Sequence, residues 1–186
     1  MNLFILRHAS AGTRRPNPLL DVKRPLDKDG KRHCLQLAYL LNSLKVQFDL
    51  VVSSPLKRSL QTASLVGTET GYEAPILHSN SLAPSATYKD FQQLLSEITR
   101  PGAHAGALKE NVLVVGHNPN LTLFLGALLA PADSAAVPSI RLRKGSIARI
   151  TLGRGPATLQ ALLDPRLVRA LYATSTKSSR PKTSRK

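Results

Sequence analysis

The chain has 186 residues, the length of one ordinary domain, and 42% of them are hydrophobic, as in folded globular proteins. Its single cysteine, Cys34, excludes an internal disulfide, and no apolar run approaches the roughly 18 residues that a membrane span requires. We therefore expect a cytoplasmic protein without membrane segments, whose least ordinary property is a formal charge of +15.

The positive charge is concentrated at the C-terminus but not confined to it. Five of the 26 basic residues follow Leu171, in a stretch without acidic residues and with few apolar ones. This composition predicts a disordered basic tail over residues 171–186, after a globular domain over residues 1–170. The rest of the chain has 21 basic against 11 acidic residues, a net charge of +10. Polyanion binding therefore stays open, although no aromatic cluster for stacking bases and no zinc-finger spacing is present.

The N-terminal part of the chain predicts a strand, a loop and a helix. Residues 3–8 form a short run of large apolar side chains that ends in Arg-His, which is typical of a buried parallel strand. Residues 9–25 contain three prolines and several basic residues, a pattern too irregular for a helix. Residues 28–44 carry apolar side chains at spacings of three and four, with Asp27 as N-cap, and predict a helix.

The next segments continue the alternation of strands and helices. Residues 50–53 predict a second buried strand, and Ser54 with the proline after it supplies a cap and a first helical residue for a second helix. Residues 75–77 predict a short edge strand, and residues 88–99 predict another helix. The prolines and glycines of residues 100–110 indicate a surface connection.

The C-terminal part contains the clearest strand, over residues 112–116, which is continuous, β-branched and apolar. His117 follows it directly, and Asn118 with the next proline repeats the capping pattern before an apolar helix. Residues 146–151 and 158–163 predict two further strands, which can pair antiparallel at an edge. Alternating strands and helices predict an α/β fold with a mostly parallel sheet.

Polar side chains stand at the carboxyl ends of three predicted strands: Arg7 and His8 at the first, Arg58 one turn into the following helix, and His117 at the third. Because parallel strands end at one edge of the sheet, we expect these side chains to converge. Two guanidiniums and two imidazoles suit a phosphoryl group, which needs charge-assisted donors for its oxygens and an in-line nucleophile for its phosphorus. Such a pocket has no need of a metal.

Four segments in this order resemble the motifs of the histidine phosphatase superfamily: Leu-Arg-His-Ala-Ser-Ala at 6–11, Arg-Pro-Leu at 24–26, Ser-Ser-Pro-Leu-Lys-Arg-Ser-Leu-Gln-Thr at 53–62, and Val-Val-Gly-His-Asn-Pro at 114–119. The resemblance covers about residues 1–165 and is closest to the SixA-type phosphohistidine phosphatases. It implies a phosphoglycerate mutase-like fold, which is a three-layer α/β/α sandwich, in its compact form without large insertions.

The resemblance also implies roles for the residues of the pocket. The family's nucleophilic histidine falls on His8, which would attack phosphorus and become phosphohistidine. Arg7, Arg58 and His117 would hold the phosphoryl oxygens and spread the charge of the transition state. Asn118 is a further candidate for phosphate binding, although helix capping also explains this residue. No cofactor is implied.

One departure from the family concerns the leaving group. Large members carry a carboxylic acid that protonates a leaving alcohol, whereas the corresponding residues 81–86 here read Ser-Leu-Ala-Pro-Ser-Ala. Because imidazole leaves phosphorus more easily than an alkoxide, the missing acid favours phosphohistidine as the substrate. Asp21 is a candidate substitute donor, with a solvated loop aspartate as the simpler interpretation. Ser10 and Arg24 are candidate contacts at the pocket rim, or loop residues only.

The sequence therefore predicts a metal-independent phosphatase that removes phosphate from phosphohistidine on a protein partner through a covalent intermediate on His8. One alternative is a phosphomonoesterase of the same mechanism that acts on a small phosphorylated metabolite. Another is a polyanion-binding module with an inactive pocket, whose basic tail contacts nucleic acid. A metal site at His8 and His117 is disfavoured because no carboxylate or cysteine accompanies them at ligand spacing.

Overall fold

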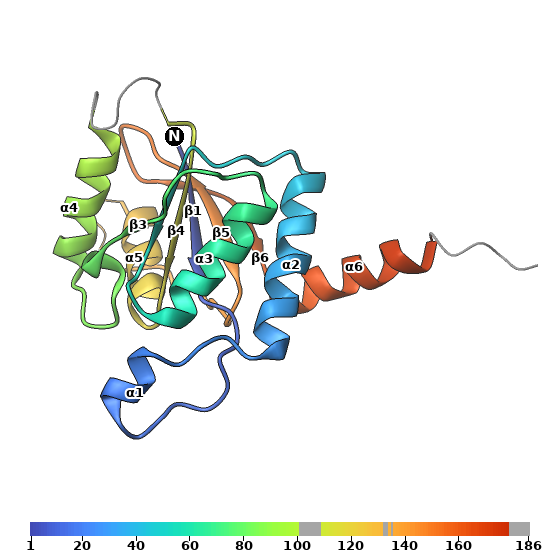
Figure 1. Cartoon of the computed structure of the whole chain (residues 1–186). Helices are drawn as coiled ribbons and strands as arrows, with labels where there is room; N and C mark the ends of the chain where they lie inside the picture. The colour runs from blue at the N-terminus through green and yellow to red at the C-terminus, as the bar shows by residue number, and fades with distance from the viewer. Residues whose placement is uncertain (101–108, 132–133, 135, 179–186) are drawn as a thin grey trace, which may run out of the picture.

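The computed structural model describes residues 1–100, 109–131, 134 and 136–178 (Figure 1). Its described part is built on a six-stranded sheet with the strand order β3-β2-β4-β1-β5-β6. The strands are β1 (Asn2–Arg7), β2 (Leu50–Ser53), β3 (Leu77–His78), β4 (Asn111–Gly116), β5 (Ile147–Thr151) and β6 (Thr158–Leu163). Strands β1 to β4 are parallel, whereas β5 pairs antiparallel with both β1 and β6. The mostly parallel sheet predicted from the sequence is confirmed.

Helices cover both faces of the sheet, as the predicted three-layer sandwich requires (Figure 1). One face carries α2 (Lys28–Ser43), α3 (Lys57–Glu69) and α6 (Pro165–Ser178), and the other carries α4 (Tyr88–Thr99) and α5 (Asn120–Leu129). Alternate side chains of β1 enter the two cores: Leu3 and Ile5 pack toward α4 and α5, and Phe4 and Leu6 toward α2 and α3. This double burial explains why the central strands are apolar throughout. Among the described helices, none has the length and apolar character to cross a membrane.

Most predicted elements lie within a few residues of their expected bounds. Asp27 caps α2 as predicted, because its Oδ1 accepts a hydrogen bond from the Gly30 amide at 2.7 Å. The predicted edge strand is the two-residue strand β3, and the last two strands are antiparallel as expected. The connection predicted over residues 100–110 lies largely outside the described residues.

Two predicted helix starts are wrong. Helices α3 and α5 begin later than the caps Ser54 and Asn118 predict, and neither helix has a side-chain hydrogen bond at its N-cap. Both side chains bind other partners. Ser54 Oγ lies 2.8 Å from Nε2 of His117, and Asn118 Nδ2 donates to the Leu142 carbonyl at 3.0 Å. The prediction missed the main partner of each side chain, although Ser54 Oγ also accepts a long bond from the Leu56 amide at 3.4 Å.

The loop predicted over residues 9–25 contains a short helix, α1 (Pro18–Val22), so the prediction of purely irregular structure is wrong there. Asn17 caps this helix, and its Oδ1 accepts from the Leu19 amide at 2.9 Å. Pro18 occupies the first turn, the one place where proline favours a helix. The segment lies beyond the carboxyl ends of the parallel strands (Figure 1).

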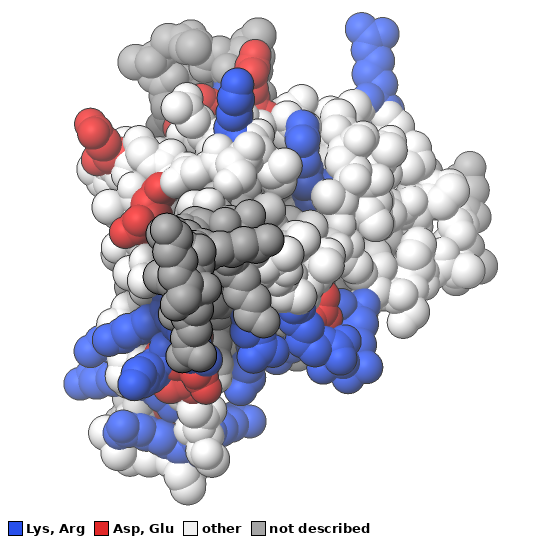
Figure 2. All heavy atoms as spheres, turned by 90° about the vertical axis from the view of Figure 1, so that its right-hand side faces the viewer, with Lys and Arg blue, Asp and Glu red and all other residues white. Residues whose placement is uncertain are grey.

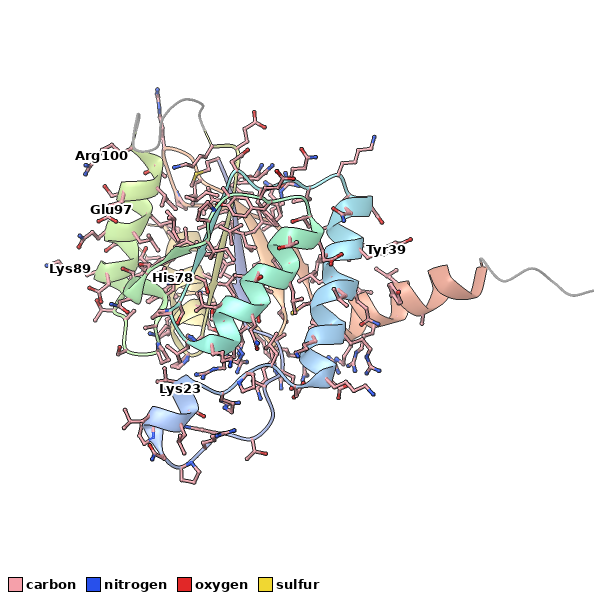
Figure 3. The ribbon with its side chains drawn as sticks, viewed as in Figure 1. Lys23, Tyr39, His78, Lys89, Glu97 and Arg100 are labelled. Atoms are coloured by element: carbon pink, nitrogen blue, oxygen red, sulfur yellow. The ribbon has the colours of Figure 1, made fainter. Side chains whose placement is uncertain are left out.

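The tail predicted from residue 171 onward is helical as far as residue 178, because α6 continues through it. Tyr172 of α6 packs edge to face on Tyr39, with 5.5 Å between the ring centroids. Tyr39 points from α2 toward α6 in Figure 3. This aromatic contact anchors a segment whose composition alone indicates disorder. The rest of the predicted tail, residues 179–186, lies outside the described residues.

Gly145 closes the loop that leads into β5 and joins three elements. Its amide donates to the carbonyl oxygens of Arg7 and His8 at 3.0 and 3.2 Å, and its own carbonyl accepts from Nε2 of His33 at 3.0 Å. Its φ is 82°, and a Cβ atom added to it would lie 2.4 Å from the His33 ring. Both the backbone conformation and the close approach therefore require glycine.

We expect Gly145→Ala to lower the free energy of unfolding by about 2–3 kcal/mol, because the new Cβ meets the His33 ring in a strained backbone conformation. Gly153→Ala is the matched control, since no atom lies within 4 Å of a Cβ at that position and its φ is not in the left-handed region. Its effect should stay within about 0.5 kcal/mol. Urea denaturation of both variants measures the difference, and equal losses would contradict this account of the loop.

Candidate active site

A cavity of about 630 Å³ lies where the parallel strands end. Its walls come from the end of β1, the α1 segment, the start of α3, the residues after the short 3₁₀ helix η1 (Asn80–Leu82), and the residues after β4. The carboxyl ends of the parallel strands are where open α/β sheets usually bind their ligands. The cavity brings together all five predicted site residues: Arg7, His8, Arg58, His117 and Asn118.

His8 is buried directly after β1, in a defined tautomer. Its Nδ1 lies 2.8 Å from the carbonyl oxygen of Ala9. Because a carbonyl only accepts hydrogen bonds, Nδ1 carries the hydrogen and Nε2 holds the lone pair. Burial lowers the pKa of His8 to about 3, and the nearby charges of Arg58, Arg7 and Lys144 lower it as well. The imidazole is therefore neutral, and within the described part of the chain no hydrogen bond uses Nε2.

His117 faces His8 across the cavity floor, with 4.9 Å between the ring centroids and 55° between the ring planes. Its Nε2 lies 2.8 Å from the Ser54 hydroxyl, which fixes the orientation of the ring. Burial first, and then the proximity of His8 and Arg58, lower the pKa of His117 to about 2. Both imidazoles are therefore neutral, and neither adds a positive charge to the site.

Arg58 is buried and Arg7 is half-buried, and both predicted phosphate-binding arginines leave part of their donor capacity unused. Arg7 Nη1 donates to the Leu142 carbonyl at 2.8 Å, and Arg58 Nη1 donates to the Asp21 carbonyl at 3.0 Å. The Nε atoms of both guanidiniums are buried without a hydrogen-bond partner in the described structure. Burial lowers the pKa of both side chains, since water no longer solvates the charge fully. Partly unpaired guanidiniums in such a place favour an oxyanion.

Asp21 belongs to an ion-pair network and is neither a general acid nor a solvated loop residue. Its Oδ1 accepts from Arg24 Nε at 2.8 Å, and its Oδ2 lies 3.3 Å from Arg58 Nη1. The hydrogen bond from Arg24 is the main reason that the pKa of Asp21 falls to about 2. The carboxylate is ionised at neutral pH and has no proton to give, so the predicted substitute donor role is not supported. Instead, Asp21 ties α1 to Arg58.

The remaining candidates differ in their positions. Arg24 lines the cavity, where its Nη1 also donates to the Ala11 carbonyl at 2.7 Å. Ser10 is not part of this lining, since its hydroxyl donates to Asp27 at 2.6 Å. Asn118 lines the cavity, but its Nδ2 is engaged by a backbone carbonyl and its Oδ1 is buried without a partner. Its role in phosphate binding stays a prediction.

The cavity is strongly electropositive. Asp21 is its one carboxylate, against five cationic side chains in the described lining: Arg7, Arg14, Arg24, Arg58 and Lys144. This excess attracts a dianion such as a phosphoryl group. In the described residues no group of three or more histidine, cysteine, aspartate or glutamate side chains is placed to hold a metal ion.

Sequence reasoning missed the contact of Ser54 with His117, the pairing of Asp21 with Arg24, and the residue Lys144. Ser54 was visible as a polar residue after β2, but its contact with His117 spans 63 positions. The spacing of Asp21 and Arg24 by three residues, after the cap and proline of α1, is a local signal that could have revealed their pair. Lys144 lies in the loop before β5, which no sequence motif marks.

Comparison with known proteins gives concordant results. The model of the family described as histidine phosphatase superfamily (branch 1) matches residues 3–85. An uncharacterized protein of Picosynechococcus sp. (strain PCC 7002) is 30% identical over 168 residues, which cover 90% of this chain and 93% of that protein.

Solved structures agree over most of the chain. The protein histidine phosphatase SixA complexed with tungstate matches with a TM-score of 0.74 and 26% identity, over 89% of this chain and 98% of that one. A putative phosphohistidine phosphatase SixA from Nakamurella multipartitia matches with a TM-score of 0.66 and 26% identity, over 88% and 95%. The alpha-ribazole phosphatase from Shigella flexneri shares the fold, with a TM-score of 0.66 and 18% identity over 89% and 97%.

The sequence motifs, the sheet order and these matches lead to one assignment. The resemblance seen in the sequence and the expected phosphoglycerate mutase-like fold are both confirmed. The chain belongs to the histidine phosphatase superfamily (branch 1), and within it the protein is a phosphatase of the SixA type.

Proposed function

We propose that the protein hydrolyses phosphohistidine on a protein partner, with His8 as the nucleophile. The observation that carries the proposal is the 2.8 Å contact between Nδ1 of His8 and the Ala9 carbonyl. It leaves the lone pair on Nε2 of a neutral imidazole inside an electropositive cavity of about 630 Å³. The likeness to a protein histidine phosphatase supports the same substrate class.

In the first step, Nε2 of His8 forms a bond to phosphorus while the P–N bond to the substrate imidazole breaks. The departing ring leaves as neutral imidazole when its other nitrogen carries a proton. His8 becomes a phosphoimidazolium, and its Nδ1–H continues to donate a hydrogen bond to the Ala9 carbonyl. In the second step, water attacks phosphorus and the bond to Nε2 breaks. Phosphate leaves, one proton passes to solvent, and His8 returns to its starting tautomer.

The surrounding donors would stabilise the charge on the transferring group. The guanidiniums of Arg7 and Arg58 would bind its equatorial oxygens, and His117 and Asn118 would complete the set. Their positions on buried strand ends and on the start of α3 hold these donors in place before the substrate binds.

The absence of a protonated carboxyl group in the described lining favours a P–N bond over a P–O bond. Asp21, the one carboxylate there, is ionised, and residues 83–85 after η1 contribute no carboxyl group. A phosphate ester of an ordinary alcohol would have to expel an alkoxide, whereas a phosphoramidate expels imidazole. A small phosphomonoester is therefore the weaker candidate substrate, and its rejection is part of the test.

We expect His8→Asn to abolish the covalent intermediate. After brief incubation with a ³²P-labelled phosphohistidine donor, the wild type should carry acid-labile label, and the variant should carry none and turn over about 1,000-fold more slowly or worse. His78→Asn is the matched control, because His78 is an exposed histidine of β3 (Figure 3). Equal labelling of the wild type and His8→Asn would refute the nucleophile.

The leaving-group argument predicts a preference between substrates. We expect kcat/KM for phosphoimidazole to exceed that for glycerol phosphate by about 100-fold or more, which is the contribution that a general acid usually makes. Steady-state phosphate release measures both rates, with His8→Asn as the background. Comparable rates would favour the phosphomonoesterase alternative, and turnover of neither substrate would favour the polyanion-binding alternative.

The neutral state of His8 predicts a pH-dependent stability. The folded pKa lies below the ordinary value of 6.5, so between about pH 6.5 and pH 3 only the unfolded chain binds this proton. The free energy of unfolding should therefore fall as the pH falls through this window. One histidine contributes a slope of about 1.4 kcal/mol per pH unit, and His8→Asn should remove it. Denaturant unfolding between pH 6 and 4.5 measures both slopes, and parallel slopes would contradict a neutral His8.

A further inference from the structure

A second, smaller cavity adjoins the proposed active site. Its volume is about 230 Å³, and it lies between the first half of α2, the start of α6 and the loop before β5. Lys144 lines both cavities, so the two share one wall. A group bound in the smaller cavity would therefore lie next to the cavity that contains His8.

The smaller cavity is also electropositive. Arg32, Lys144 and Arg169 line it and are exposed, and Asp29 is the one carboxylate of the described lining. Asp29 pairs with Arg32 at 2.8 Å, and no described carboxylate forms an ion pair with Lys144 or Arg169. Two cations are thus available for an anion. On the face that carries α2 and α6, lysine and arginine side chains gather toward the end where α1 lies (Figure 2).

The back wall of this cavity is rigid and polar. His33 is only 7% exposed, and its Nε2 hydrogen is bound by the Gly145 carbonyl, so Nδ1 holds a lone pair. Nδ1 of His33 and Oε1 of Gln36 are both buried without a hydrogen-bond partner. A peptide segment brings N–H donors together with carboxylates, whereas a free phosphate dianion brings at most one donor. The lining therefore fits an acidic peptide better than inorganic phosphate.

We propose that this second cavity is an anion subsite that receives an acidic side chain of the protein whose phosphohistidine occupies the first cavity. The inference rests on the proposed function and adds the character of the partner, which is acidic beside its phosphorylated histidine. Lys144 between the two cavities would contact both anionic groups. Such a subsite raises the affinity and association rate of the protein substrate and leaves the chemical step unchanged.

The test uses two phosphohistidine peptides of equal length, one with four glutamates around the phosphohistidine and one with four glutamines. We expect the wild type to favour the glutamate peptide about 10-fold in kcat/KM, mainly through KM. Arg169→Glu should abolish this preference and leave phosphoimidazole turnover unchanged, which also shows that the variant is folded. Arg154→Glu is the charge-matched control, because this residue lies in the turn after Thr151, which pairs with Asn2 at the far end of β1.

A binding measurement separates failure of the subsite from failure of the proposed function. Fluorescence anisotropy of the unphosphorylated glutamate peptide should show weaker binding to Arg169→Glu than to wild type and Arg154→Glu, whether or not the enzyme turns over phosphohistidine. Equal binding by all three proteins, or measurable and equal turnover of the two peptides, would overturn the subsite. Binding of inorganic phosphate, but not of the peptide, in an Arg169-dependent manner would overturn it as well. Turnover of neither peptide with Arg169-dependent binding intact would instead refute the proposed function alone.

Discussion

The constraint on which this structure depends is the crowding of two guanidiniums and two imidazoles at one end of the sheet, where Arg58, His8 and His117 are buried and Arg7 is half-buried. Four positive charges could not be held together there, and the fold avoids them by keeping His8 and His117 neutral through burial. Arg7 and Arg58 retain their charge, and each donates a hydrogen bond to a backbone carbonyl. Arg58 also forms an ion pair with Asp21. The result is a cavity whose donors are incompletely satisfied by the protein, which is the condition under which an oxyanion binds strongly.

Asp21 is an ionised carboxylate that contacts Arg58 and has no proton to donate to a leaving group. A protonated acid near the leaving group would serve phosphate esters, but the hydrogen bond from Arg24 keeps Asp21 ionised. Its charge instead offsets part of the repulsion between Arg24 and Arg58, and its carbonyl fixes Arg58 from a second direction. The same residue holds α1 over the cavity. The α1 segment therefore contributes to positioning Arg58 rather than to proton transfer.

The sequence predicted the elements and the site residues whose signals are local. Apolar runs with a polar residue at their end revealed β1 and β4, and the topology of parallel strands brought His8 and His117 into one cavity as expected. Contacts between distant residues could not be read in this way, so Ser54 appeared to be a helix cap and Asp21 a loop aspartate. The helix over residues 171–178 was not predicted because charge dominates the composition there, although Asp164 and Pro165 carry the cap and proline signal of α6.

The loop from Leu142 to Gly145 explains how such distant residues act as one unit. The Leu142 carbonyl accepts from both Arg7 and Asn118, and Gly145 binds the backbone of β1 on one side and His33 of α2 on the other. One short loop thus orients donors of the large cavity and, through Lys144, lines the small one. Because hydrogen bonds within the protein fix this loop and its partners, the donors are already arranged in the free protein, so little binding energy is needed to order them. A protein substrate with an acidic neighbour beside its phosphohistidine would meet two cavities whose spacing is already set, and Lys144, carried by this loop, would respond to both of its charges.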